Sequence, residues 1–183
     1  MENIEKEVKF LNVDNEAVQE RLLSLGANDE GRQVLRDDVY YFPGPQEFQR
    51  WCRVRLHGDK AWMCYKDQQT DNKIDTNEIE FEVSDPVKAK LFLEKCGLYL
   101  KRSQEKHRHK FTYKNFVFDF DEWPMNAKFL EIEGQDEAEM EAICRELGLQ
   151  WEQRVFGTSL NCLKEQFKIP VDTYKHFTFE LID

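Results

Sequence analysis

Apolar and charged residues alternate with a period of two in several segments, which is typical of strands with two different faces. In the first segment, residues 4–10, the charged face holds Glu5, Glu7 and Lys9, and the other face is mainly apolar. The same alternation recurs at residues 52–56, 78–83, 106–110, 116–121 and 130–133. These strands therefore have one side suited to a core and one side that is charged.

Between the strands, apolar residues recur with helical spacing behind a capping residue. Three predicted helices begin at Asp14, Asp85 and Asp136 and end before a glycine, at residues 25, 96 and 147. A glycine at this point is typical of a helix C-terminus. A fourth, short helix is predicted from about Thr158 to Phe167.

A short internal repeat links the two kinds of element. Three times an acidic strand, written EKEVKF, NEIEFEV or FLEIEG, leads into a helix that ends in glycine. The acidic strands are thus expected at comparable places in one sheet. Because the helices need apolar surface to cover, we predict an α+β fold: a strongly curved antiparallel sheet or barrel with helices outside and the charged strand faces inside.

Length and composition narrow the class of protein. The 183 residues predict a single domain over residues 1–167, with a C-terminal tail of unassigned role at 168–183 after the break expected at Pro170. No apolar run has the roughly 20 residues that a membrane span needs, and no signal peptide is recognisable, which predicts a cytoplasmic protein. The net charge of −10 disfavours nucleic acid as a partner.

The charges are segregated by sign, since each strand supplies mainly acids or mainly bases. For any single strand the ordinary interpretation is a solvated face, but a solvated face usually mixes both signs. Acidic and basic strands that converge inside a barrel need pairing, water or bound ions, because uncompensated buried charge is costly. We therefore expect a divalent cation and a polyanion as ligands.

The residue types suggest which ligands. Carboxylates without His or Cys partners suit Mg²⁺ or Mn²⁺, and alternate residues place the pairs Glu5/Glu7 and Glu131/Glu133 on single strand faces. Six bases exceed what one phosphate monoester requires, and their mixture of Arg and Lys suits a linear triphosphate. They are Lys9, Arg53, Arg55, Lys66, Lys106 and Arg108.

The order of these groups resembles a known family. The run comprises Glu5-x-Glu7-x-Lys9, Asp38-x-Tyr40-Tyr41, Arg53-x-Arg55, Lys66, Glu78-x-Glu80-x-Glu82, Lys106-x-Arg108, Asp121 and Glu131-x-Glu133. From Ile4 to Phe167 the chain is similar to the CYTH superfamily, also called triphosphate tunnel metalloenzymes. The resemblance implies a closed eight-stranded antiparallel β-barrel, or tunnel, with a bound divalent metal and a triphosphate substrate.

The resemblance also implies roles for individual residues. Metal ligation falls to Glu5, Glu7, Glu131 and Glu133, with Glu80 as a further acidic tunnel residue, and phosphate binding falls to the six bases. Catalytic roles fall to Glu5, Glu7, Lys9 and Asp121. The chain departs from the common pattern at Phe42 and at residues 157–160.

Three functions follow as alternatives. The leading one is metal-dependent hydrolysis of an inorganic, nucleoside or thiamine triphosphate. The second is a class IV adenylate cyclase, which makes cyclic AMP and pyrophosphate from ATP. The third is a non-catalytic module that binds polyphosphate or a nucleotide, which the departures from the pattern motivate. In each case the expected partner is a small molecule, and the protein is expected to be a monomer or a homodimer.

Overall fold

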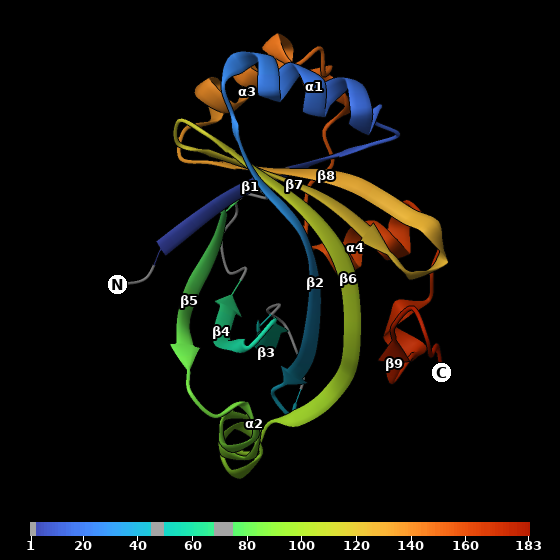
Figure 1. The fold of residues 1–183 in the computed structure, drawn as a ribbon. Helices are drawn as coiled ribbons and strands as arrows, with labels where there is room; N and C mark the ends of the chain where they lie inside the picture. The colour runs from blue at the N-terminus through green and yellow to red at the C-terminus, as the bar shows by residue number, and fades with distance from the viewer. Residues whose placement is uncertain (1–2, 45–49, 68–74) are drawn as a thin grey trace.

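A single curled antiparallel sheet forms the body of the protein (Figure 1). The computed structural model describes residues 3–44, 50–67 and 75–183, and for residues 3–5 and 75 it describes only the backbone. The strands are β1 (Asn3–Leu11), β2 (Asn28–Tyr41), β3 (Arg50–His57), β4 (Lys60–Asp67), β5 (Asp75–Val83), β6 (Tyr99–Tyr113), β7 (Phe116–Trp123), β8 (Ala127–Gly134) and β9 (His176–Phe177).

The helices lie where the sequence predicts them. They are α1 (Asn15–Leu25), α2 (Pro86–Lys95), α3 (Glu137–Glu146) and α4 (Ser159–Glu165). Short 3-10 turns are found at η1 (Pro124–Asn126), η2 (Trp151–Gln153) and η3 (Val171–Thr173). Each α-helix is capped as expected, because the side chains of Asp14, Asp85, Asp136 and Thr158 accept a backbone hydrogen bond from the first turn.

The strand pairings confirm the predicted curled antiparallel sheet. The order is β2-β3-β4-β5-β1-β8-β7-β6, and β6 pairs again with β2. The three acidic strands β5, β1 and β8 belong to one sheet, as the internal repeat predicts, and in it they are neighbours. The β1–β5 junction is short, pairing Asn3–Lys6 with Asp75–Glu78, whereas β2 and β6 pair along most of their length.

The main core lies between the sheet and the helices α1 and α3, which cover the same side of β1, β7 and β8 (Figure 1). Val8 and Phe10 of β1 and Leu130 and Ile132 of β8 are buried against this layer. Each fully buried side chain of this kind contributes roughly 1.5–3 kcal/mol. Because the apolar face of these strands lies under the helices, their charged face is directed into the sheet's interior.

The outer face of β5 departs from this arrangement. Helix α2 packs against β3, β4 and β6 through Leu93, whereas Ile79 and Phe81 of β5 are exposed. The expectation that helices cover the apolar face of every strand is therefore wrong for β5. The helices cover only part of the outer surface of the sheet.

The C-terminal residues pack as part of the domain wall. The β6–β7 pairing begins at His107, and the earlier part of β6 instead pairs in parallel with β9, Ser103 opposite His176. Phe177 is fully buried in a second apolar cluster with Trp123 and Val171. Residues 168–183 thus extend the sheet where β7 has diverged from β6.

A search of the described helices finds none that combines the length and the apolar character of a membrane span.

Truncation of Phe177 tests whether the tail belongs to the cooperative unit. Phe177→Ala should lower the free energy of unfolding by about 3–5 kcal/mol, because it empties a fully buried site. The matched control Leu181→Ala removes a half-exposed side chain of the same tail and should change it by less than about 0.5 kcal/mol. Equal effects in chemical denaturation would show that the cluster does not stabilise the domain.

Candidate functional site

A buried network of charges lies where β6, β7 and β8 run side by side. Arg108 donates from Nε and Nη2 to the two carboxylate oxygens of Asp121, at 2.6 and 2.8 Å, and from Nη2 to Glu131 at 2.7 Å. Lys106 Nζ donates to the same Asp121 carboxylate at 2.5 Å. Arg108 also forms an ion pair with Asp119. Two bases from one strand are thus held by three carboxylates from the next two strands.

The network continues into β1 and the start of α4. Lys9 is fully buried and donates to Glu7 at 2.7 Å and to the carbonyl oxygen of Gly157 at 2.8 Å. Its Nζ lies 3.5 Å from Oε1 of Glu131, and the same oxygen accepts from the Ser159 hydroxyl at 2.7 Å. The segment at residues 157–160, where the chain departs from the resembled pattern, therefore still supplies two contacts to the network.

A second group of charges lies on the wall formed by β2, β3, β4 and β5. Arg55 donates to both oxygens of Asp37, at 2.7 and 2.9 Å. Arg53 donates to Glu80 at 2.8 Å, and Lys66 Nζ lies 3.3 Å from Glu78. Because inward residues alternate along each strand, this wall presents its bases toward the same interior as Lys106 and Arg108.

The two walls enclose a cavity of about 710 Å³. Its lining includes ten basic residues, Arg50, Arg53, Arg55, Lys66, Lys101, Arg102, Lys106, Arg108, Lys110 and Lys164. It includes eight acidic residues, Glu7, Asp37, Glu78, Glu80, Asp119, Glu131, Glu133 and Asp172. Among the described residues the lining is therefore net positive, although the chain as a whole carries a charge of −10. Such a cavity attracts anions.

Most residues predicted from the sequence line this cavity. Glu7, Arg53, Arg55, Lys66, Glu80, Lys106, Arg108, Glu131 and Glu133 all do so. Lys9 and Asp121 lie just behind the lining, where each is bound to residues that face the cavity. The Glu5 side chain lies outside the described residues, and its backbone pairs with Thr76.

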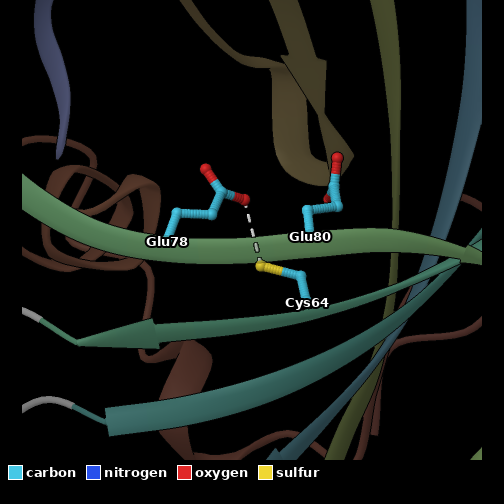
Figure 2. A group of neighbouring side chains, drawn as sticks. All are labelled: Cys64, Glu78 and Glu80. Carbon is cyan, nitrogen blue, oxygen red and sulfur yellow. Dashed lines mark hydrogen bonds between the residues drawn. The ribbon is translucent and has the colours of Figure 1, made fainter. Parts of the chain in front are cut away.

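Glu80 belongs to a different group from the other predicted metal ligands. Ligand atoms of Cys64, Glu78 and Glu80 lie within 4.8 Å of one another, the one such group of three found in the described ranges. Figure 2 shows Cys64 on β4 beneath the two glutamates of β5, and its thiol donates to Glu78 at 3.0 Å. Burial raises the pKa of this thiol, so it remains protonated. Arg53 pairs with Glu80 and Lys66 with Glu78, so the two glutamates also compensate bases of this wall.

Sequence reasoning missed Asp37 and Asp119, although Asp119 falls in the alternating segment 116–121. Asp37 shares its strand face with the buried Leu35 and Val39, so the apolar alternation conceals it. Asp119 lies on the face of Asp121, two residues away, and is almost fully buried. The one sequence feature that could have indicated Asp37 is Arg55 on an inward strand face, because a buried guanidinium requires a carboxylate partner.

The sequence of the strands that build this site matches an established family. A comparison with protein families matches residues 3–155 to the CYTH domain. The chain belongs to the CYTH domain family. The match includes every strand from β1 to β8 and ends before α4 and the C-terminal tail.

Solved structures show the same fold as this CYTH domain. A protein of Pyrococcus horikoshii OT3 is 27% identical with a TM-score of 0.69, over 82% of this chain and 94% of that chain. A candidate adenylate cyclase from Vibrio parahaemolyticus is 14% identical with a TM-score of 0.74, over 90% and 99%. A candidate adenylyl cyclase from Hippeastrum, described as having a dominant triphosphatase activity, is 12% identical with a TM-score of 0.62, over 93% and 98%. No curated protein matches.

The carboxylates of β1 and β8 in this CYTH domain suit a hard divalent cation. Glu7 is directly opposite Glu133 in the β1–β8 register, and Glu131 lies two residues from Glu133 on the same face. All three line the cavity. A donor set of carboxylate oxygens fits Mg²⁺ or Mn²⁺ better than softer metals.

Opposite charges hold the key carboxylates of the CYTH domain in their ionised form. Burial alone would raise the pKa of Glu131, but Lys106, Lys9 and Arg108 hold it well below its ordinary value. Burial likewise opposes the ionisation of Asp37, and Arg55 with Arg53 holds its pKa far below the usual range. In contrast, the pKa of Asp119 is raised, mainly by burial. The negative charges of Asp121 and Glu131 raise it further, and these effects together outweigh the lowering effect of Arg108.

These shifts predict how stability depends on pH. A depressed carboxylate pKa contributes stability that is complete above the unfolded value near 4 and is lost as the pH falls toward the folded value. The free energy of unfolding should therefore decrease below about pH 4, with Asp119 acting in the opposite direction. In Asp37→Asn the slope of the free energy of unfolding against pH should be shallower in this range by up to about 1.4 kcal/mol per pH unit.

The control for this experiment is Glu20→Gln, which alters an exposed carboxylate of α1. It should keep the slope of the unmodified protein in urea unfolding measured from pH 2.5 to 6. An unchanged slope in Asp37→Asn would refute the account of its ion pair.

Proposed function

We propose that this CYTH domain hydrolyses triphosphates in the cavity with the help of a divalent cation. The observation that carries the proposal is the facing pair of basic walls, Arg53, Arg55 and Lys66 on one and Lys106 and Arg108 on the other, in an acidic protein. A single phosphate would use one of these groups. A chain of phosphates can engage both walls at once.

The bases are arranged to grip phosphate oxygens without moving far. Arg55 and Arg108 are each fixed by a two-pronged contact with a carboxylate, on Asp37 and Asp121 respectively. Such preorganised donors stabilise the charge that develops during phosphoryl transfer, because they require little rearrangement when it appears. Asp37 and Asp121 therefore act as positioning residues.

Glu7, Glu131 and Glu133 are the residues that would hold the cation. A bound divalent ion would neutralise phosphate oxygens and help to position the attacking water. Lys9 sits behind this group and fixes Glu7 and Glu131 through its ammonium. Burial opposes the charged form of Lys9, but these two glutamates hold its pKa above the ordinary value, so it stays charged.

Hydrolysis makes fewer geometric demands than cyclisation. Water attacks the terminal phosphorus, the bond from that phosphorus to the bridging oxygen breaks, and the products are phosphate and a diphosphate. Cyclisation requires in addition a ribose held with its 3′ hydroxyl in line with the α-phosphorus. The polar lining described above supports the holding of the phosphate chain, to which hydrolysis adds only an attacking water.

An assay of products tests the proposal and separates its competitors. Tripolyphosphate, ATP and thiamine triphosphate are incubated with Mg²⁺ or Mn²⁺, and phosphate, pyrophosphate and cyclic AMP are measured. Phosphate release supports hydrolysis. Cyclic AMP with pyrophosphate would show the cyclase, and tight binding without turnover would show a binding module, and either result overturns the proposal.

A substitution on the β4 wall tests the role of the bases. Lys66→Met should lower kcat/KM for tripolyphosphate about 100-fold, because it removes a donor to the reacting chain. Lys60→Met on the same strand removes an exposed lysine that is paired with Glu82, and it should leave kcat/KM unchanged. Equal activity of the two variants would exclude Lys66 from the site.

A carboxylate substitution tests the cation site. Glu133→Gln should raise the Mn²⁺ concentration needed for half-maximal activity at least about tenfold, and electron paramagnetic resonance should show weaker Mn²⁺ binding. Glu82→Gln, at the exposed end of the other acidic run, serves as the matched control. Unaltered Mn²⁺ binding in Glu133→Gln would contradict this assignment.

A further inference from the structure

One end of the cavity is built partly by residues outside the family match. The register of β2 and β6 shifts so that Val39 is opposite Arg102 while Tyr40 is opposite Leu100. Lys101 is the extra residue of this bulge. Successive residues of a regular strand face opposite sides, but here both Lys101 and Arg102 line the cavity.

Arg102 differs from the other arginines of the site in its partners. It is fully buried, and it donates from Nε to Gln104 at 3.0 Å and from Nη1 to the carbonyl oxygen of Val171 at 3.3 Å. Its guanidinium also interacts with the Tyr41 hydroxyl. Its Nη2 has no hydrogen-bond partner among the residues that the structure describes. Arg55 and Arg108, in contrast, are each paired with a carboxylate. Arg102 is therefore a buried charge with a donor to spare.

The surroundings of Arg102 are also positively charged. Lys101 donates to the backbone carbonyl of Asp172 at 2.8 Å, and Lys164 pairs with the Asp172 carboxylate. Three bases thus share a single acidic side chain at this end. Of the three, Arg102 alone is fully buried, and Lys164 is about half exposed. A buried guanidinium without a carboxylate partner is unfavourable, and an electron-rich group beside it would relieve this.

The Arg102 end is connected to the central site but lies well away from it. Gln104 joins the two, because it accepts from Arg102 and donates to Asp37, the partner of Arg55, at 3.4 Å. Arg102 precedes Lys106 by four residues on the same strand, which corresponds to about 13 Å. A ligand that extends along β6 can therefore contact both residues.

We propose that Arg102 binds an oxygen acceptor of the substrate that lies beyond its triphosphate. The inference rests on the proposed function and narrows the substrate to triphosphates that carry an extension. The acceptor is a ring or sugar oxygen of an organic ester, or a further phosphate of a longer chain. Tyr41 and Tyr99 line this same end, with ring centroids 6.4 Å apart, and offer flat apolar surface beside the acceptor.

The residues that complete this end come from the C-terminal part of the chain. Lys164, Val171 and Asp172 all lie after residue 155, where the family match ends. Selection among extended triphosphates is thus assigned to Arg102 of β6 together with a C-terminal segment that lies outside the family match.

The experiment compares substrates with and without an extension. KM and kcat are measured for tripolyphosphate, tetrapolyphosphate and ATP with Mn²⁺ in the unmodified protein and in Arg102→Gln. The variant should raise KM at least about tenfold for the substrate that carries the recognised extension, since a charged donor is lost. KM for tripolyphosphate and all kcat values should stay within about twofold. Whether ATP or tetrapolyphosphate responds identifies the source of the acceptor.

Controls separate recognition from a structural role. Arg36→Gln alters a largely exposed arginine of β2 and should change no KM. If Arg102→Gln does not fold, Lys164→Ala, a half-exposed neighbour, should give a smaller increase in the same direction. An equal KM change for all three substrates, or no change in either variant, would overturn the inference while leaving triphosphate hydrolysis intact. Failure of the unmodified protein to use any triphosphate would instead overturn the proposed function.

Discussion

The structure depends on the mutual compensation of charges that the curled sheet turns inward. Lys9, Lys106 and Arg108 are almost fully buried, and each would be prohibitively costly in isolation. Apart from Glu7, which shares β1 with Lys9, their carboxylate partners come from other strands, so correct strand order is a condition for charge balance. Removing one partner leaves a buried charge, whereas the intact set presents ordered donors to an anion.

The internal repeat explains how one chain builds this arrangement. An acidic strand followed by a helix and a further strand occurs as β1-α1-β2 and again as β5-α2-β6. In the sheet β1 pairs with β5, and β2 pairs with β6. The acidic strands are thereby gathered on one side of the interior, and β6 brings its bases to their other side. Segregation by sign along the sequence becomes complementarity across the cavity.

Much of the fold and of the charged interior was predictable from the sequence, because the alternation of apolar and charged residues indicates the two faces of a strand directly. The inward charged faces of β1, β6 and β8 and the capped helices followed from spacing alone. The positions of Asp37 and Arg102 did not. Asp37 is hidden in an apolar face, and the inward turn of both Lys101 and Arg102 depends on a bulge that only the β2–β6 register reveals. The packing of the tail also required knowledge of where β7 leaves β6.

The most direct test of the central claim is a crystal structure of the protein with tripolyphosphate and Mn²⁺. The account predicts a phosphate chain inside the cavity that contacts Arg55 and Arg108 from opposite walls. It also predicts an anomalous manganese peak beside Glu7, Glu131 and Glu133. Phosphate bound on the outer surface, or an interior in which the ion pairs exclude the anion at saturating concentration, would contradict it.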